Sequence, residues 1–242
     1  MYFCFKFNLM LKFFKKKKFS PLRTEFDESI KEFSKEELKL INLLNYTKKS
    51  ASTYSGELYD IGYHTLELEN KVLKGQRNPN ARFNNVPYDF KGKTVLDIGS
   101  NQGGMLNACA KEIAFGVGID YDARMVNVAN RIKEHSNAKN LQFYVFDLEK
   151  EKLAYIKDFL PTDTVDICFL LSVCMWLKNW KELILFVHAI SETLLFESNG
   201  SDLQQQQQIG FLKLTYKDVL LINEISDDDP LQKKRKLLLC KK

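Results

Sequence analysis

The stretch from Thr94 to Gly104, TVLDIGSNQGG, decides the fold. Its first half is a short apolar run typical of a buried strand, and its second half is rich in residues that let the chain turn sharply into a helix. Gly99 permits the turn, while Gly103 and Gly104 allow a ligand and the helix to approach the backbone closely. Because the first N–H groups of a helix have no partner within it, this turn is the expected site of a nucleotide-like ligand, at the carboxyl end of a strand.

The glycine spacing and one acid restrict the kind of ligand. The glycines fall at positions 99, 103 and 104, so the G-x-G-x-x-G pattern that receives the pyrophosphate of a dinucleotide is absent. No G-K-[ST] follows, which excludes a P-loop. Asp97 precedes the turn, and its carboxylate would repel a phosphate but could hold an ammonium group. The stretch therefore favours a cationic ligand without phosphate groups.

Strand-like and helix-like segments alternate after this stretch. Apolar runs predict strands over 115–120, 141–148, 165–172 and 192–198, with helices over 103–113 and 122–135. This alternation indicates parallel β-α-β units in a sheet that is covered on both faces. Two further apolar runs, 218–226 and 235–242, follow each other too closely for a crossover helix and so predict an antiparallel hairpin. The glutamine run inside 201–209 is of low complexity and predicts a solvated loop.

Three acids in strand contexts give the chain a family resemblance. Asp97 lies in the pattern D-x-G-x-N-x-G, Asp120 ends GVGID, and Asp147 follows LQFYVF. With these motifs, residues 90–242 resemble the class I S-adenosylmethionine-dependent methyltransferases, whose first motif is D/E-x-G-x-G-x-G. Asn101 replaces the middle glycine, which is a mild departure because asparagine tolerates left-handed backbone geometry.

The resemblance implies a fold, an activity and a set of binding residues. The implied fold is an α/β three-layer Rossmann-like sandwich with a mostly parallel seven-stranded sheet in the order 3-2-1-4-5-7-6. The implied activity is methyl transfer from S-adenosylmethionine, with Asp120 binding both ribose hydroxyls and Asp147 the adenine amino group. Capping of the following helix is the structural alternative for both acids. The expected cofactor-binding residues are Asp97, Gly99, Ser100, Asn101, Gly103, Asp120, Tyr121, Asp147, Leu148 and Ser172.

Residues 27–89 are expected to form an N-terminal helical cap before this domain. Apolar residues recur at helical spacing over 27–48, where Ser34 and Glu37 resemble a capping box. Pro79 and Pro87 bracket an expected loop.

Within the cap, the aromatic and basic stretch 54–82 is predicted to fold over the cofactor cleft. Methyl transfer benefits from the exclusion of water, and this stretch is the material before the core that could supply a cover. Tyr63, His64 or Arg77 would then face the methionine end of the cofactor.

The methyl acceptor is not identified by any motif. The segment SVCMWLKNW from Ser172 lacks the [DN]-P-P-[YFW] tetrapeptide of many amino-group methyltransferases, which disfavours methylation of adenine or glutamine nitrogens. Met175 and Trp176 either line an apolar substrate pocket or begin a packed helix with Trp180. The catalytic candidates are His64 as a general base and Glu197 as a group that orients substrate; a structural histidine and a turn cap are their alternatives.

The net charge of +5 is concentrated at one end of the chain. Residues 1–18 carry six lysines and no acid, and the rest carries 30 basic and 31 acidic residues, so a domain-wide nucleic-acid surface is not supported. Residues 1–26 are expected to be a disordered basic-aromatic leader, with weak contact to an anionic membrane surface as the alternative. No stretch approaches the ~20 apolar residues of a transmembrane helix.

The cysteines and the near-neutral charge of the chain outside residues 1–18 favour a cytoplasmic enzyme that acts on a small molecule. Five scattered cysteines exclude a disulfide scaffold and a CxxC zinc site, and no metal is expected. Two other functions stay open. One is a tRNA- or RNA-modifying methyltransferase whose lysine-rich leader grips phosphate, and the other is a cofactor-binding relative without turnover.

Overall fold

The protein is described by a computed structural model for residues 33–47, 63–68, 71–75, 77–226 and 234–242. The chain divides into two compact units, Met1–Leu38 and Lys39–Lys242. The predicted leader lies outside the described residues. Helix α2 (Lys35–Thr47) begins with the predicted capping box, since the Ser34 N–H donates to the Glu37 carboxylate at 2.6 Å and the Glu37 N–H donates to the Ser34 hydroxyl at 3.2 Å.

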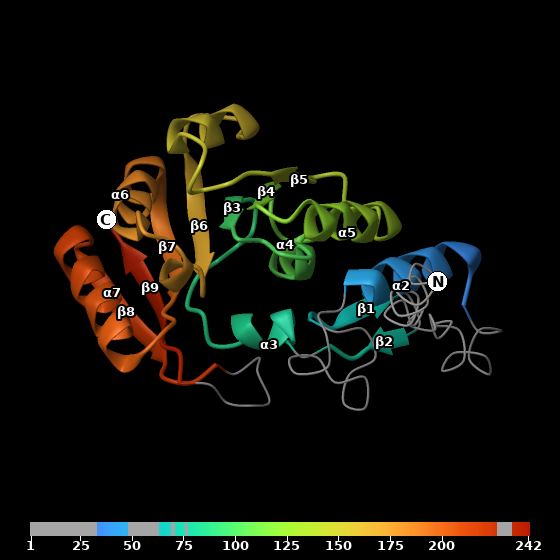
Figure 1. Cartoon of the computed structure of the whole chain (residues 1–242), viewed down its shortest axis with the longest axis horizontal. Coiled ribbons are helices and arrows are strands. Elements are labelled where there is room, and N and C mark those ends of the chain that lie inside the picture. The colour runs from blue at the N-terminus through green and yellow to red at the C-terminus, as the bar shows by residue number, and fades with distance from the viewer. Residues whose placement is uncertain (1–32, 48–62, 69–70, 76, 227–233) are drawn as a thin grey trace, which may run out of the picture. The chain divides into compact units, whose positions relative to one another are not determined.

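The second unit is built on a seven-stranded sheet in the order β5-β4-β3-β6-β7-β9-β8 (Figure 1). Its strands are β3 (Thr94–Ile98), β4 (Phe115–Asp120), β5 (Leu141–Val145), β6 (Val165–Leu171), β7 (Ser191–Glu197), β8 (Asp218–Asn223) and β9 (Leu237–Lys241). β3 to β7 pair in parallel, and β9 pairs antiparallel with both β7 and β8. Counted along the chain, this order is 3-2-1-4-5-7-6, which confirms the predicted topology and the antiparallel pair.

Helices cover both faces of the sheet and make it three-layered. One apolar cluster joins the sheet to α6 (Trp180–Ile190), α7 (Asp202–Thr215) and the 3₁₀ segment η2 (Leu153–Phe159). The other joins it to α4 (Gly104–Cys109) and α5 (Ala123–His135), on the opposite side in Figure 1. Successive residues of β3 enter different clusters, Val95 one and Leu96 the other, as the alternation of side chains along a strand requires.

The glutamine run is helical, so the predicted loop is wrong. Ser201 and Gln204 form a reciprocal capping box at the start of α7, and glutamine is a good helix former. The Gln208 side chain is buried, where its amide donates to the Asn199 carbonyl at 3.0 Å and its oxygen accepts the Asn199 N–H at 3.1 Å. The low complexity of this run does not mean that all its side chains face solvent. A glutamine side chain has both a hydrogen-bond donor and an acceptor, so it can pair with buried backbone groups.

The segment before the sheet is mixed rather than purely helical. β1 (Leu66–Leu68) and β2 (Lys71–Leu73) form a small antiparallel sheet. Helix α3 (Pro79–Phe83) then occupies the start of the predicted loop. It forms because the Asn78 side chain accepts the Asn80 N–H at 3.1 Å and Pro79 stands in the first turn, where proline is favoured.

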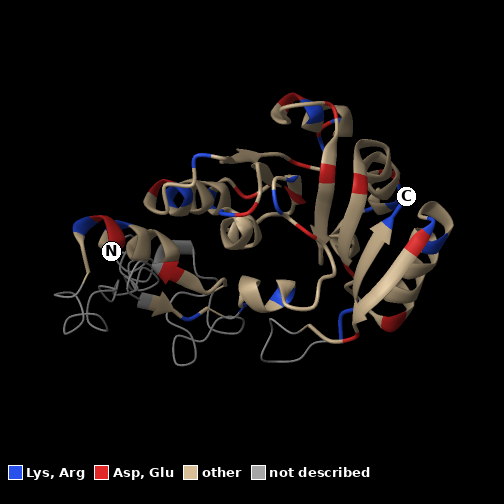
Figure 2. Ribbon diagram, turned by 180° about the vertical axis from the view of Figure 1, so that it is seen from behind, with Lys and Arg blue, Asp and Glu red and all other residues tan. Residues whose placement is uncertain are grey.

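Charged residues and cysteines occupy different parts of the domain. Basic and acidic residues are interspersed along the helices of the domain (Figure 2). Cys109, Cys168, Cys174 and Cys240 are free and buried, and burial raises the pKa of the Cys174 thiol to about 12. Within the described ranges, none of the helices has the length and apolarity needed to cross a membrane.

Candidate functional site

The loop between β3 and α4 has the backbone geometry that its sequence predicts. Gly99, Asn101 and Gly103 all adopt left-handed conformations, with φ of 77°, 49° and 71°. A Cβ on Gly99 would lie 2.6 Å from a methyl group of Val173, and one on Gly103 would lie 2.6 Å from the Phe143 ring. Both glycines are therefore required by backbone and by space, and asparagine takes the middle position as expected.

Asp97 places a buried carboxylate beside this loop. The residue is 2% exposed, and its Oδ2 atom has no hydrogen-bond partner among the described residues. Burial raises the pKa of Asp97 to about 7; the Arg82 guanidinium acts in the opposite direction, and Asp120 adds to the rise. The Ser100 hydroxyl is also buried without a described partner. Buried polar atoms left unpaired cost about 1–3 kcal/mol each, so these two atoms fit a ligand that brings hydrogen-bond donors, such as an ammonium group.

Asp120 ties the loop to the neighbouring strand. Its Oδ2 accepts the Asn101 N–H and its Oδ1 accepts the Asp122 N–H, both at 2.9 Å. The cap of α5 is Asp122, whose side chain accepts the Arg124 N–H, so capping does not explain Asp120. The adjacent Tyr121 is 70% exposed.

Asp147 does stabilise the turn that follows it, as its structural alternative proposes. Its Oδ1 accepts the Glu149 N–H at 3.0 Å, and its Oδ2 pairs with Lys150 at 2.8 Å. The hydrogen bond from Lys150 holds the pKa of Asp147 below its ordinary value. An adenine contact by Asp147 stays a prediction.

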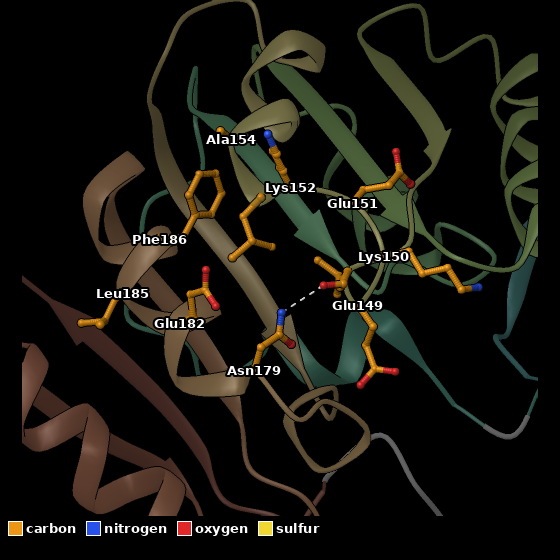
Figure 3. Close-up of a pocket in the computed structure, with 11 residues that line it drawn as sticks. Glu149, Lys150, Glu151, Lys152, Ala154, Asn179, Glu182, Leu185 and Phe186 are labelled. Carbon is orange, nitrogen blue, oxygen red and sulfur yellow. Dashed lines mark hydrogen bonds between the residues drawn. The ribbon is translucent and has the colours of Figure 1, made fainter.

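Beyond Leu148 the surface is hollowed into an open cavity of about 670 Å³ between residues 148–154 and α6 (Figure 3). The Asn179 side-chain amide donates to the Leu148 carbonyl at 3.1 Å and links its two walls. Glu149 and Lys150 lie at one side of the view, and Leu185 and Phe186 at the other. Leu148 is the one predicted cofactor residue in the lining, so this cavity borders the adenine end of the expected site and does not contain the loop chemistry.

Glu197, at the end of β7, is the centre of a buried ionic cluster. Its carboxylate lies 2.8 Å from Arg82, 3.5 Å from Arg235 and 3.8 Å from Arg77. The hydroxyl of Ser172 also donates to it, and Ser172 itself has a left-handed φ of 59° at the end of β6. Both Glu197 oxygens are occupied by cationic or hydroxyl donors. The carboxylate therefore fixes the positions of the arginines and of Ser172 around it.

The cap residues meet the carboxyl edge of the sheet. The Thr65 N–H donates to the Arg77 carbonyl and the Arg77 N–H to the Tyr63 carbonyl, both at 2.7 Å. A Cβ on Gly104 would lie 2.3 Å from His64 Nδ1, so the imidazole packs directly on the start of α4. The structure thus brings His64 to the glycine loop and Arg77 to Glu197, while residues 54–62 lie outside the described ranges. The catalytic and substrate roles of these side chains stay predictions.

The segment after β6 carries the two apolar substrate candidates, Met175 and Trp176, and they differ in exposure. Met175 is half-buried, and its N–H donates to the Asn199 side chain at 3.0 Å. Trp176 is 71% exposed in the short 3₁₀ turn η3 (Cys174–Trp176). Helix α6 begins separately at Trp180, whose ring packs on Phe211. Trp176 therefore does not belong to a packed helix with Trp180, and it lies at the surface a few residues from Ser172.

Sequence reasoning missed two members of the Glu197 cluster, Arg235 and Ser226. The Ser226 hydroxyl lies 3.3 Å from Glu197, and Arg235 precedes β9. Neither lies in a motif, because the cluster is assembled from chain segments that only the sheet brings together. The sequence therefore offers no signal for either residue.

Comparisons with known proteins agree with this geometry. Residues 89–201 match a family described as a methyltransferase domain. No curated protein matches the chain. Among solved structures, the N-terminal domain of EvdMO1 in the presence of SAH and D-fucose is similar with a TM-score of 0.57 and 12% identity, over 73% of this chain and 89% of that one. The same domain with SAH bound gives 0.57 and 11%, over 73% and 90%. At these identities the likeness concerns the fold.

The fold and the acidic glycine loop define a class I S-adenosylmethionine-dependent methyltransferase. Residues 89–201 form its methyltransferase domain, and the cofactor of this enzyme is S-adenosylmethionine.

Proposed function

We propose that the enzyme methylates a small-molecule acceptor at the carboxyl ends of β3, β6 and β7. The observation that carries the proposal is Asp97, a buried carboxylate with an unpartnered oxygen beside the glycine loop. Asp97 and Ser100 would hold the ammonium end of the cofactor, and charge-assisted hydrogen bonds of this kind are the strong ones. The near balance of charges outside residues 1–18 favours a small acceptor over a nucleic acid.

The remaining loop residues would bind the nucleoside. Asp120, at the end of β4 beside the loop, would accept the ribose hydroxyls, and Gly99, Asn101 and Gly103 would let the cofactor approach the backbone. Tyr121, Asp147 and Leu148 follow β4 and β5 at the adenine end. Leu148 borders the open cavity of Figure 3, which supports a ligand edge at that place.

Methyl transfer would require mainly that the acceptor is positioned correctly and that water is excluded from the site. When bound, S-adenosylmethionine supplies an activated sulfonium with a transferable methyl group. The residues at this edge would hold the acceptor in line with that methyl group, and a base of the protein would take up the acceptor proton. Ser172, Met175 and Trp176 would border the acceptor, and in-line orientation together with water exclusion supplies most of the rate.

The cap would supply the base and the cover. His64 is the proposed base, because the structure brings its imidazole to the glycine loop. Tyr63, whose ring centroid lies 4.4 Å from that of His64, would complete the cover over the methionine end. Glu197 is proposed as a positioning residue and not as a base, since its oxygens are already held by arginines and Ser172.

Two measurements test this function. Calorimetry should show binding of S-adenosylhomocysteine and no binding of NAD. Labelled S-adenosylmethionine should then transfer its methyl group into the small-molecule fraction of a cell extract, and Asp97→Asn should reduce this transfer at least about tenfold at a cofactor concentration well below saturation. Label that entered only RNA would instead favour the RNA-modifying alternative, and truncation of residues 1–18 would then be expected to abolish RNA affinity. Cofactor binding without transfer to any fraction would favour the relative without turnover.

A further inference from the structure

The carboxyl edge of β6 and β7 carries more positive than negative charge among the described residues. Glu197 is a single buried carboxylate that faces Arg77, Arg82 and Arg235, at 3.8, 2.8 and 3.5 Å. Asp97, near the end of β3, also interacts electrostatically with Arg82. A guanidinium stays charged throughout the physiological pH range, so Arg77 and Arg82 retain their charge although they are buried.

Arg235 differs from the other two arginines in its exposure and in its contacts. Its side chain is 22% exposed, against 2% for Arg77 and 7% for Arg82. Its Nη1 atom lies 3.5 Å from Glu197 and donates to the Ser172 hydroxyl at 3.1 Å. These are the polar contacts of Arg235 within the described ranges, and they leave its Nη2 and Nε donors facing no described acceptor. Arg235 therefore combines an anchored guanidinium with unused donors.

The position of Arg235 matters because Ser172 ends β6. The proposed function places the methyl acceptor beside this strand end, next to Met175 and Trp176. Ser172 is held there with a left-handed φ of 59°, and such strain in a residue other than glycine persists only where surrounding contacts enforce it. Arg235 and Glu197 supply contacts of that kind through the Ser172 side chain.

We propose that the methyl acceptor is a small anion whose carboxylate or phosphate group is bound by Arg235. This inference rests on the proposed function and names its substrate class. A guanidinium offers two parallel N–H donors that match carboxylate and phosphate oxygens, and it keeps its orientation here because Glu197 and Ser172 hold its other edge. The exposed Trp176 nearby would cover the apolar part of the same molecule.

The first test asks whether the acceptor is retained as an anion. A cell extract is ultrafiltered to remove RNA and protein and is passed over an anion-exchange resin. The full chain is then incubated with labelled S-adenosylmethionine and one of three fractions: the unretained small molecules, the salt-eluted small molecules, or the macromolecules held back by ultrafiltration. Only the salt-eluted fraction should accept label. Label from the unretained fraction, or only from the macromolecules, would overturn the anionic small acceptor but leave methyl transfer intact. An absence of label from every fraction would contradict the methyltransferase function itself.

The second test asks whether Arg235 is the binding group. Arg235→Gln should raise the KM for the retained acceptor at least about tenfold, because a hydrogen bond to a charged group is lost. The affinity of Arg235→Gln for S-adenosylhomocysteine should stay within about twofold of the wild-type value. General destabilisation of the protein would instead weaken the binding of both acceptor and cofactor. Arg235→Lys should restore part of the affinity if charge is recognised. Arg131→Gln is the matched control, since Arg131 is exposed on α5 and pairs with Glu134. An unchanged acceptor KM in Arg235→Gln would overturn the assignment. Carboxylate and phosphate acceptors are distinguished by treating the retained fraction with phosphatase before the assay.

Discussion

Asp97 offers the sharpest test, because its buried negative charge is expected to lower the stability of the folded protein and to strengthen cofactor binding. Its pKa lies at about 7, against an ordinary value of 3.8, mainly because burial disfavours the charged form. A difference of roughly 3 units corresponds to about 4 kcal/mol. The native protein therefore holds a proton that the unfolded chain releases between pH ~3.8 and ~7, and the stability due to this group falls as pH rises through that range.

Asp97→Asn removes this cost and should stabilise the ligand-free protein at high pH. At pH 8 the variant should unfold at a higher urea concentration than the wild type, by up to about 4 kcal/mol in free energy of unfolding. Toward pH 4 the difference should shrink, since a protonated carboxyl and an amide are both neutral.

The same substitution should impair the cofactor site. An ammonium group favours the ionised carboxylate, so wild-type affinity for S-adenosylhomocysteine should rise with pH and be about tenfold weaker at pH 6 than at pH 8. Asp97→Asn should bind at least about tenfold more weakly at pH 8 and show little of this pH dependence.

Urea unfolding of the ligand-free proteins at pH 5 and 8, with calorimetry at pH 6 and 8, measures both effects. Asp163→Asn serves as the control, because Asp163 is exposed. A variant that is less stable than wild type at pH 8 would show that Asp97 has a structural partner. A wild-type affinity equal at pH 6 and 8 would refute the proposed contact with the ammonium group.

Three further predictions concern the loop and the leader. Asp120→Ala should weaken S-adenosylhomocysteine binding at least about tenfold while the domain stays folded by circular dichroism; unchanged affinity would refute the contact of Asp120 with the ribose. Asn101→Gly should retain binding and Asn101→Val should lose stability, because a β-branched residue resists a φ of 49°; equal melting temperatures would contradict this reasoning. Removal of residues 1–18 should abolish salt-sensitive co-sedimentation with anionic vesicles and leave S-adenosylhomocysteine affinity unchanged, and equal, negligible sedimentation of both proteins would remove the membrane hypothesis.

The sheet was predictable because its information is local. Each parallel strand is a compact apolar run, and the run FGVGID coincides with β4, residues 115–120. The left-handed backbone at Asn101 also followed from its place between two glycines. The alternation of strands and helices then leaves few topologies, because parallel connections have a fixed hand.

The glutamine helix and the Glu197 cluster show where local information ends. The glutamine run was misjudged because composition does not reveal that Gln208 is buried against Asn199. The cluster at Glu197 joins Arg77, Arg82 and Arg235, which are far apart in sequence and meet only through tertiary structure. Ionic contacts carry no periodicity, so no sequence pattern predicts them.

The placement of β9 between β7 and β8 constrains the order in which the chain folds. β8 comes earlier in the sequence, yet β9 is its one neighbour in the described sheet. Residues 218–223 therefore cannot join the sheet until 237–241 is available to pair with them, either in a free hairpin or already docked on β7. The pairing of β9 with β7 closes a long loop before it returns any stability, and such steps are slow. Amide hydrogens of β8 should consequently gain protection no earlier than those of β9 during refolding, and anything that detaches β9 should release both strands together.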